Sequence, residues 1–174
     1  MELRAIHAIA RRLKLVVFDI DGVLTDGRLY YGPDGESLKV FNVRDGHGIK
    51  SLQRAGITVA VITGRNSKMA AARMRDLGVE HLVQGREDKG VALDELLAEL
   101  DISPNETAYM GDDVMDIPAM RKVALALTVQ DAHPDVIPVA HWRARNPGGR
   151  GAAREACDLL LAARGTNVHA ESDT

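Results

Sequence analysis

The sequence predicts an α/β fold in which helices cover both faces of a doubly wound parallel sheet, giving three layers. Short apolar runs of strand length alternate with helical patterns, at roughly 25 residues per strand–helix unit. Several helical stretches end in glycine, which is typical of the position after a helix C-terminus. The 174 residues suffice for one compact domain with a sizeable core. We therefore expect a single domain over residues 1–174.

The expected strands are apolar and rich in β-branched residues, as strands buried on both faces of a parallel sheet are. They are Leu15–Phe18, Thr58–Ile62, His81–Val83, Thr107–Met110 and Val123–Val129. A short N-terminal helix is expected before the first strand. The other expected helices are Gly48–Ala55, Ser67–Leu77, Gly90–Leu100, Val114–Lys122 and Ala152–Ala163.

One segment, Gly27–Val43, breaks this alternation. It holds two β-like runs around Gly32-Pro33-Asp34-Gly35, which is a hairpin signal. It follows the first strand directly, where a parallel α/β fold normally has a helix. An inserted hairpin there would project from the carboxyl edge of the sheet, where such folds bind ligands. The tail, residues 166–174, has no pattern and is expected to be frayed.

The composition excludes several classes of protein. A net charge of −3 and a pI near 6.1 argue against nucleic acid as the main partner. Cys157 is the only cysteine, so the chain forms no internal disulfide and requires no oxidising compartment. No stretch approaches the ~18 apolar residues of a membrane span. The N-terminal segment carries too many charges for a secretory signal, so we expect a cytoplasmic protein.

Polar motifs follow four of the expected strands. Asp19–Asp26 comes directly after the first strand, and Thr63–Asn66 after the second. Lys89 opens the helix after the third strand, and Gly111–Asp116 follows the fourth. Because the carboxyl ends of the strands in such a sheet meet at one crevice, we expect these motifs to lie together.

The convergence would place up to four carboxylates, those of Asp19, Asp21, Asp112 and Asp113, within a few ångströms. Each like-charge pair at about 4 Å costs from ~1 kcal/mol in water to ~4 kcal/mol at an effective dielectric near 20. Lys89 alone cannot neutralise this charge. Mg²⁺ prefers such oxygen ligands together with water and substrate phosphate. The cluster has no nearby His or Cys ligand, which argues against zinc.

A cation and a phosphate at this crevice suggest a role for each side chain. Asp19 can attack phosphorus in line and form an acyl phosphate. Asp21, two residues on, can protonate the leaving oxygen and then activate water. Thr63 and Lys89 can hold the equatorial phosphate oxygens. The sequence thus predicts a magnesium-dependent phosphomonoesterase.

The four motifs resemble those of the haloacid dehalogenase superfamily. They read Asp19-x-Asp21-Gly22-Val23-Leu24-Thr25-Asp26-Gly27, Thr63-Gly64-Arg65, Lys89 and Gly111-Asp112-Asp113-x-x-Asp116. The resemblance implies that Asp19 is the nucleophile and Asp21 the acid/base. It also implies that magnesium is held by Asp19, Asp112 and the main-chain carbonyl of Asp21. Asp113 would support the metal ligands without binding the metal directly. Asp116 would fix either the loop that carries Asp112 or the side chain of Lys89.

Four further segments carry a narrower resemblance: Phe41–Gly46, Gln84-Gly85, Asp131–Pro134 and Gly148–Ala152. With them, nearly the whole chain is similar to the 3-deoxy-D-manno-octulosonate 8-phosphate (KDO 8-phosphate) phosphatase family. This resemblance implies hydrolysis of that sugar phosphate in lipopolysaccharide precursor synthesis.

The motif spacing leaves no room for a cap domain. Only 41 residues separate Asp21 from Thr63, and the hairpin and one helix occupy most of them. A cap of about 50 residues or more cannot be inserted there. A phosphomutase protects its phospho-aspartate with a cap, so this spacing argues against a mutase. The uncapped site can accept a bulky substrate or take its lid from a neighbouring subunit.

Selection of the sugar is predicted from a few residues beside the crevice. Arg65 can pair with the carboxylate of a 2-keto sugar acid, with Gly64, Asn66 and Arg150 as further substrate-binding candidates. Relatives in this capless group act on nine-carbon sialic-type sugar acid 9-phosphates and tend to carry glutamate after Thr-Gly. The arginine at position 65 resembles the phosphatases of the eight-carbon KDO 8-phosphate instead. A non-catalytic oligomerisation module is the alternative from another class. Such a module would be expected to have lost Asp19, Asp21 or Lys89.

The same resemblance implies a homotetramer. In a monomer the hairpin would leave strand edges and aromatic side chains uncovered, among them Tyr30, Tyr31 and Phe41. Closing the hairpins of several subunits into one central β-structure would cover them. The glycine-rich segment 146–151 could then bring Arg150 to a neighbouring site.

Overall fold

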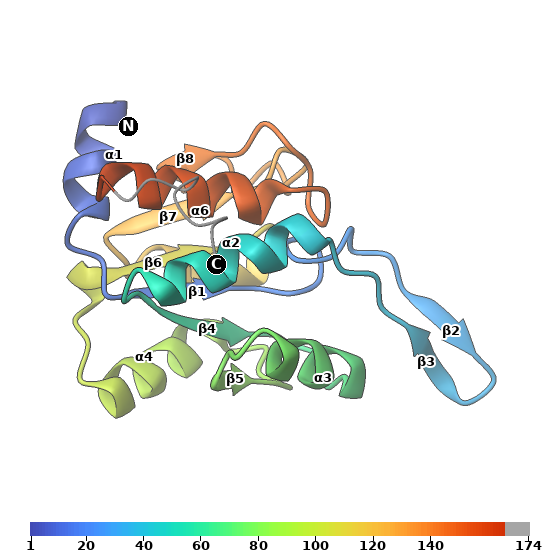
Figure 1. Cartoon of the computed structure of the whole chain (residues 1–174). Helices are drawn as coiled ribbons and strands as arrows, with labels where there is room; N and C mark the ends of the chain where they lie inside the picture. The colour runs from blue at the N-terminus through green and yellow to red at the C-terminus, as the bar shows by residue number, and fades with distance from the viewer. Residues whose placement is uncertain (166–174) are drawn as a thin grey trace, which may run out of the picture.

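The computed structural model describes residues 1–165, and its centre is a six-stranded sheet in which every paired strand runs parallel. The strands are β1 Leu15–Phe18, β4 Thr58–Ile62, β5 His81–Val83, β6 Thr107–Met110, β7 Leu125–Thr128 and β8 Trp142–Arg143. Their order is β5-β4-β1-β6-β7-β8, so the chain winds outward from the central strand in both directions (Figure 1). The predicted doubly wound parallel sheet is confirmed.

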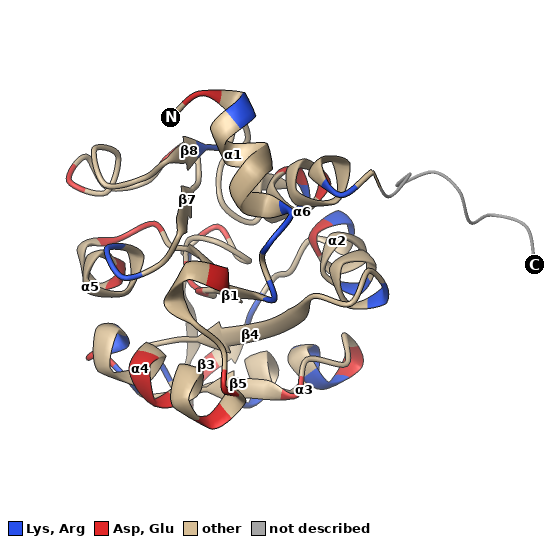
Figure 2. Ribbon diagram, turned by 90° about the vertical axis from the view of Figure 1, so that its left-hand side faces the viewer, with Lys and Arg blue, Asp and Glu red and all other residues tan. Residues whose placement is uncertain are grey.

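Helices cover both faces of this sheet. They are α1 Leu3–Ala10, α2 Val43–Arg54, α3 Lys68–Asp76, α4 Lys89–Leu100, α5 Ile117–Met120 and α6 Ala152–Ala163, with short 3₁₀ turns η1 Pro104–Glu106 and η2 Val114–Asp116. Helices α1, α2, α3 and α6 lie on one face, and α4 and α5 on the other (Figure 2). Within residues 1–165, none of these helices combines the length and apolar character needed to span a bilayer.

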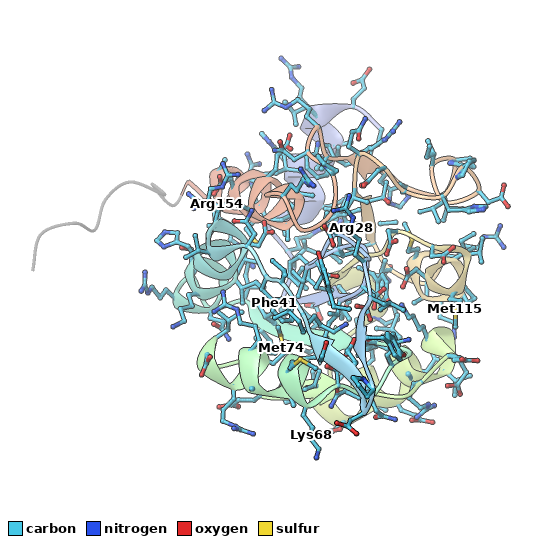
Figure 3. The ribbon with its side chains drawn as sticks, turned by 90° about the vertical axis from the view of Figure 1, so that its right-hand side faces the viewer. Arg28, Phe41, Lys68, Met74, Met115 and Arg154 are labelled. Atoms are coloured by element: carbon cyan, nitrogen blue, oxygen red, sulfur yellow. The ribbon has the colours of Figure 1, made fainter. Side chains whose placement is uncertain are left out.

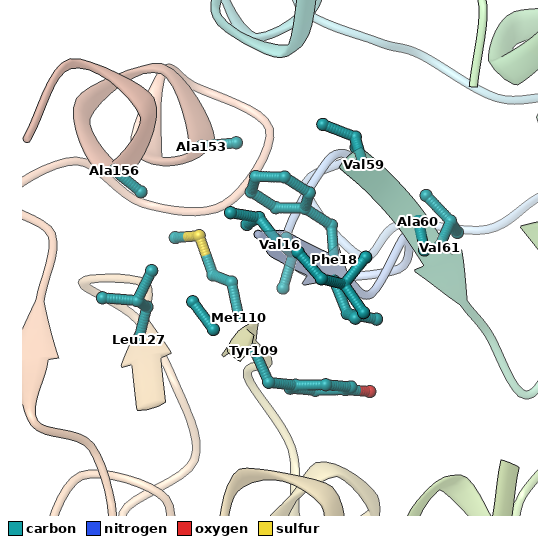
Figure 4. Close-up of a cluster of buried hydrophobic side chains, with 14 of the residues drawn as sticks. Val16, Phe18, Val59, Ala60, Val61, Tyr109, Met110, Leu127, Ala153 and Ala156 are labelled. Atoms are coloured by element: carbon teal, nitrogen blue, oxygen red, sulfur yellow. The ribbon is translucent and has the colours of Figure 1, made fainter. Parts of the chain in front are cut away.

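The core lies between the sheet and its helices. Strands β1, β6 and β7 are buried along their whole length, which explains why their sequences are continuous apolar runs rather than alternating ones. Phe18 and Tyr109 are the largest fully buried side chains and come from the neighbouring strands β1 and β6. Figure 4 shows side chains of β1, β4, β6 and β7 packed in one cluster with alanines of α6. This packing fixes the strand ends from which the polar motifs start.

Helix α2 begins earlier than the sequence predicts. It starts at Val43 rather than Gly48, because the Asn42 side chain caps it by accepting a hydrogen bond from the Arg44 N–H at 2.9 Å. The glycines at 46 and 48 weaken the helical pattern. They are explained by packing, since a Cβ at Gly48 would lie 3.0 Å from Cys157 Cβ on α6.

Other differences concern element ends. The expected helix Val114–Lys122 is divided into η2 and the short α5, and the expected strand Val123–Val129 is trimmed to β7. The edge strand β8 was not predicted, because its two residues are too few to give a pattern. The predicted frayed tail, residues 166–174, lies outside the described part of the chain.

The predicted hairpin is confirmed as a two-stranded arm, β2 Tyr30–Gly32 and β3 Gly35–Leu38. The arm projects away from the sheet in Figure 1, and Figure 3 shows the molecule from the arm's side. Tyr31 is 63% exposed, as expected for an uncovered arm. Phe41 differs from the expectation, since it is half-buried at the root and packs against the core. Besides the arm, residues 1–165 add no separate cap to the sheet and its helices.

Candidate active site

The end of β1 carries the first two aspartates of the site. The Asp19 N–H donates to the Met110 carbonyl at 3.0 Å, so the sheet spacing continues to the aspartate itself. The chain then turns tightly, because the Ile20 carbonyl accepts hydrogen bonds from three successive amides that begin at Val23. The turn leaves Asp19 buried and Asp21 half-exposed at the carboxyl edge of the sheet.

The predicted motifs after the four strands converge there. Lys89, at the start of α4, lies with its Nζ 2.9 Å from Asp19 Oδ2 and 2.7 Å from Asp116 Oδ1. Burial acts to lower the pKa of Lys89, but the two carboxylates outweigh burial and raise the pKa. Lys89 is therefore a buried ammonium that joins the motif after β1 to the motif after β6.

Asp116 organises the loop after β6. Its Oδ1 accepts hydrogen bonds from Lys89 and from the Tyr109 hydroxyl at 2.8 Å. Its Oδ2 accepts from the N–H groups of Asp112 at 3.0 Å and Asp113 at 3.1 Å. Because both of its oxygens accept hydrogen bonds, Asp116 orients the loop. The Asp112 Oδ1, by contrast, has no hydrogen-bond partner among the described residues and can bind a cation.

Asp19 and Asp112 have the geometry of cation ligands. Within residues 1–165, no hydrogen-bond donor reaches the buried Oδ1 of Asp19 or the buried Oδ1 of Asp112. Asp19, Asp112 and Asp116 each offer a carboxylate oxygen within 4.8 Å of the others. Buried, unpartnered carboxylate oxygens such as those of Asp19 and Asp112 are costly unless a cation satisfies them, and oxygen ligands without nitrogen or sulfur suit Mg²⁺. The residues present fit the predicted metal.

The pKa values of Asp19 and Asp112 are also consistent with a bound cation. Burial, followed by the neighbouring Asp116 charge, raises the pKa of Asp19 to about 7, although Lys89 opposes the shift. Burial, followed by the Asp19 charge, raises the pKa of Asp112 to about 8. A bound cation would therefore lower the pKa of both carboxylates and favour their ionised form.

Asp21 is held from the side of the arm. Its Oδ1 accepts a hydrogen bond from the Lys39 ammonium, which also lies 3.3 Å from Glu36 Oε1. Its Oδ2 is buried and has no hydrogen-bond partner within residues 1–165, and Arg65 Nε lies 3.8 Å away from it. Asp21 is thus fixed by a hydrogen bond to one oxygen, whereas its other oxygen is buried beside Arg65 without one.

Arg65 connects the loop after β4 to the arm. Its Nη2 donates to the Tyr31 hydroxyl at 2.9 Å and lies 3.7 Å from Glu36 Oε1. The side chain is 38% exposed and borders the crevice beside Asp21. A substrate carboxylate would have to compete with these acidic neighbours for the guanidinium group.

Thr63 is buried at the end of β4 and is held by the sheet, because its N–H donates to the Val83 carbonyl at 2.9 Å. Gly64 follows it, half-buried, and Asn66 is exposed on the same loop. The Asn66 amide packs on Gly85, where a Cβ would lie 2.6 Å from Asn66 Nδ2. These three predicted residues therefore lie on one loop beside Arg65.

The glycine-rich segment 146–151 packs on the Asp21 loop of its own chain. The Gly149 N–H donates to the Val23 carbonyl at 2.9 Å, and a Cβ at Gly148 would lie 1.7 Å from the Gly22 carbonyl oxygen. The Gly148 N–H in turn donates to Asp131 Oδ1 at 2.9 Å. The glycines are thus explained by close approach within the chain. Arg150, next to them, is exposed.

Three residues at the site were not singled out from the sequence. Lys39 and Glu36 come from the arm, and Tyr109 from the interior of β6. A signal for Lys39 exists in the alternation of Ser37–Phe41, which places Lys39 on the same face as the core-packed Phe41. Tyr109 gave no signal, since an aromatic residue in a buried strand is ordinary core.

Comparison with known proteins identifies relatives that cover nearly the whole chain. The family model for haloacid dehalogenase-like hydrolases matches residues 35–124. The 3-deoxy-D-manno-octulosonate 8-phosphate phosphatase of Yersinia pestis is 51% identical over 155 residues, which cover 89% of this chain and 83% of the relative.

Solved structures agree with the sequence comparison. The phosphatase of that name from Moraxella catarrhalis, in complex with magnesium, phosphate and KDO, is 37% identical with a TM-score of 0.91. The match covers 94% of each chain. The cobalt-bound enzyme from Haemophilus influenzae is 39% identical with a TM-score of 0.91, covering 94% of this chain and 96% of the other.

Proposed function

Because the chain belongs to the haloacid dehalogenase-like hydrolase family, we propose that it is a magnesium-dependent phosphatase that converts KDO 8-phosphate to KDO and inorganic phosphate. The observation that carries this proposal is the pair of buried, unpartnered carboxylate oxygens on Asp19 and Asp112 beside the Lys89 ammonium. The identity to the Yersinia pestis phosphatase and the KDO complex of the Moraxella catarrhalis enzyme support the choice of substrate.

The metal would be held by the carboxylates of Asp19 and Asp112 and by the main-chain carbonyl of Asp21. Bound there, Mg²⁺ supplies positive charge that offsets the carboxylates and the phosphate dianion. Asp113 and Asp116 support these ligands from outside, with Asp116 fixing the loop backbone and Lys89.

In the first step an oxygen of Asp19 attacks phosphorus, and the bond from phosphorus to the sugar oxygen breaks. Asp21 donates its proton to that sugar oxygen, so the oxygen leaves as a neutral hydroxyl group. Thr63 and Lys89 hold the equatorial phosphate oxygens during the transfer, because both are buried at the crevice and offer donors. The product is an aspartyl phosphate on Asp19.

In the second step a water molecule attacks the same phosphorus atom, and Asp21 takes a proton from it. The bond from phosphorus to the Asp19 oxygen breaks, which regenerates the Asp19 carboxylate and releases inorganic phosphate. Asp21 is then protonated again, as the next cycle requires.

The sugar would be selected on the loop after β4, with Gly64, Arg65 and Asn66 as binding residues. Arg65 is the only one with a charge to offer the sugar-acid carboxylate, and it borders the crevice. Arg150 would contribute to the site of a neighbouring subunit, because its side chain is exposed next to the loop that carries Asp21.

We further propose that residues 1–174 form one capless domain that assembles into a homotetramer in the cytoplasm and serves lipopolysaccharide precursor synthesis. The support for assembly is the arm, which exposes Tyr31, Leu38 and Val40 together with its strand edges. Arms from four subunits packed together would cover these side chains and bring each one beside a neighbouring crevice.

Phosphate release across a panel of sugar phosphates tests the proposed function. We expect KDO 8-phosphate to be the best substrate, ahead of nine-carbon sugar acid 9-phosphates and of neutral hexose phosphates. A preference for the nine-carbon acid would replace the substrate and keep the chemistry. No release from any member, with Mg²⁺ present, would favour the non-catalytic module.

A further inference from the structure

Lys39 is a buried cation that the mechanism above does not use. It lies just after β3, at the root of the arm, and its side chain is only 2% exposed. Its ammonium contacts two carboxylates, Asp21 Oδ1 and Glu36 Oε1. Burying a charge is costly unless it is paired, so a lysine at this place requires a reason.

The root of the arm holds Lys39 rigidly. Two residues on, Phe41 packs against the core, and Asn42 caps α2 through the Arg44 N–H. The position of the ammonium is therefore set by the folded domain rather than by the exposed end of the arm. Glu36, 3.3 Å away, fixes it from the other side.

The contact with Lys39 gives the two carboxylate oxygens of Asp21 different roles. Oδ1 accepts the hydrogen bond from Lys39, whereas the buried Oδ2 has no hydrogen-bond partner among the described residues. A carboxyl group whose Oδ1 accepts from an ammonium carries its proton on Oδ2, because Lys39 has only donors to offer. The proton therefore lies on the side of Arg65, the proposed sugar-acid ligand, whose Nε is 3.8 Å from Oδ2.

We propose that Lys39 is a positioning residue that holds Asp21 so that Oδ2 exchanges the proton with the leaving sugar oxygen. The inference rests on the proposed phosphatase function and adds a residue to it. In the first step the O–H bond of Asp21 Oδ2 breaks and a bond from that proton to the sugar oxygen forms. In the second step Oδ2 takes a proton from the attacking water. Lys39 keeps its own protons throughout.

This role differs from two others that Lys39 could have. A lysine that binds the substrate anion would chiefly change KM, and a lysine that only stabilises the fold would affect all substrates alike. In the first step, a positioning residue for Asp21 affects only substrates whose leaving group needs the Asp21 proton, whereas the second step is the same for every substrate. An alkyl phosphate such as KDO 8-phosphate needs that proton, whereas p-nitrophenyl phosphate releases a stable anion without it.

The test is Lys39→Met, which keeps the length and removes the charge. We measure kcat and KM with KDO 8-phosphate and with p-nitrophenyl phosphate, and compare kcat/KM, which reports the steps up to departure of the leaving group. The expected loss in kcat/KM on KDO 8-phosphate is about 10- to 100-fold with little change in KM, at or below the lower end of the roughly 10²- to 10⁴-fold of a general acid. On p-nitrophenyl phosphate the expected loss in kcat/KM is under about threefold.

A double-mutant cycle separates action through Asp21 from every other action. In the Asp21→Asn background, Lys39→Met should cost no more than about twofold, because the group that it positions is already gone. Lys39→Arg, which keeps charge and donors, should recover most of the activity. Lys14→Met, which removes an exposed lysine paired with Glu106 at 2.8 Å, serves as the matched control and should leave kcat unchanged.

Equal losses in kcat/KM on both substrates, or a full loss in the Asp21→Asn background, would overturn the proposal in favour of a structural role. A rise in KM alone would overturn it in favour of substrate binding. If Lys39→Met does not fold, Glu36→Gln removes the second partner of the ammonium and is measured by the same ratio of substrates. Wild-type activity on KDO 8-phosphate tests the phosphatase function separately, so the two failures are distinguishable.

Discussion

Gly22 lies so close to Asp112 that a Cβ at position 22 would be 2.0 Å from Asp112 Oδ2. The backbone there also has a positive φ of 95°, which favours glycine. Gly22→Ala should therefore displace the Asp112 carboxylate and weaken magnesium binding by at least tenfold, with a matching loss of activity at limiting Mg²⁺. Calorimetric titration with Mg²⁺ measures the first effect directly.

The matched control for this change is Gly56→Ala. Gly56 also has a positive φ, 77°, but no heavy atom of residues 1–165 lies within 4 Å of its Cβ position. Both substitutions carry backbone strain of about 1 kcal/mol or more, and only the first contacts a carboxylate. A similar magnesium affinity in the two variants would contradict the assigned role of Asp112.

Replacing the two aspartates after β1 should have different effects. Asp19→Asn should abolish turnover, because an amide is not nucleophilic and also weakens metal binding. Asp21→Asn should lower kcat by roughly 10²- to 10⁴-fold through loss of the acid/base, while magnesium still binds. Phosphate-release assays with magnesium titrations measure both. Near-normal turnover in Asp19→Asn would rule out the aspartyl-phosphate mechanism.

Magnesium removal should expose the raised pKa values of the metal site. The pKa of Asp19 is about 7 and that of Asp112 about 8, against an ordinary value of 3.8. Because these pKa values are raised in the folded state, the metal-free protein should lose stability as pH rises from the ordinary value of 3.8 to about 8, above which the loss levels off. Mg²⁺ competes with the protons, so its stabilising effect should grow over the same range.

Thermal unfolding at pH 6, 7 and 8, with chelator and with saturating Mg²⁺, checks this expectation. The difference in melting temperature between the two conditions should increase with pH, and activity should be absent in chelator. A difference that stays constant from pH 6 to 8, or full activity in excess chelator, would speak against the carboxylate metal site.

Arg65→Ala tests recognition of the sugar acid. If Arg65 pairs with the substrate carboxylate, the change should weaken kcat/KM for KDO 8-phosphate by roughly 10- to 150-fold, the equivalent of about 1.5–3 kcal/mol. A small neutral phosphate ester should be nearly unaffected. Equal losses on both would instead assign Arg65 to holding the arm through Tyr31 and Glu36, which it contacts in the free protein.

The assembly is tested by mass in solution. Light scattering at micromolar concentration should give about four times the chain mass of 18.8 kDa. Tyr31→Ser together with Val40→Ser, which removes two exposed apolar side chains of the arm region, should lower the association state. A fully active monomer would contradict the idea that the lid is borrowed from a neighbour.

The sheet could be predicted because its strands have a clear sequence pattern. Leu15–Phe18 and Thr58–Ile62 are buried on both faces, so their apolar runs are uninterrupted and their ends coincide with charged motifs. The start of α2 was missed because tertiary packing, through Gly48 against Cys157, overrides the low helix propensity of glycine.

The site was predictable where its residues sit at strand ends, as Asp19 and Asp112 do. Lys39 was not singled out, because a charged residue in an exposed hairpin is ordinarily a solvated one, and the alternation that places it on the face of Phe41 is a weak signal. The role of Asp116 as acceptor of four hydrogen bonds likewise depends on the side chains of Lys89 on α4 and Tyr109 on β6, together with two main-chain N–H groups of its own loop.

Gly148 and Gly149, which pack on the Asp21 loop, are synthesised long after that loop, so the active site can form only late in translation. Val23 leaves the ribosome early, whereas Gly149, whose N–H it accepts, follows at a delay on the order of 10 s at about 5–20 residues per second. For that interval the nascent chain carries its reactive carboxylates without the segment that sets their loop. We therefore expect a premature stop before Gly148 to yield a product that retains the catalytic aspartates and lacks the activity.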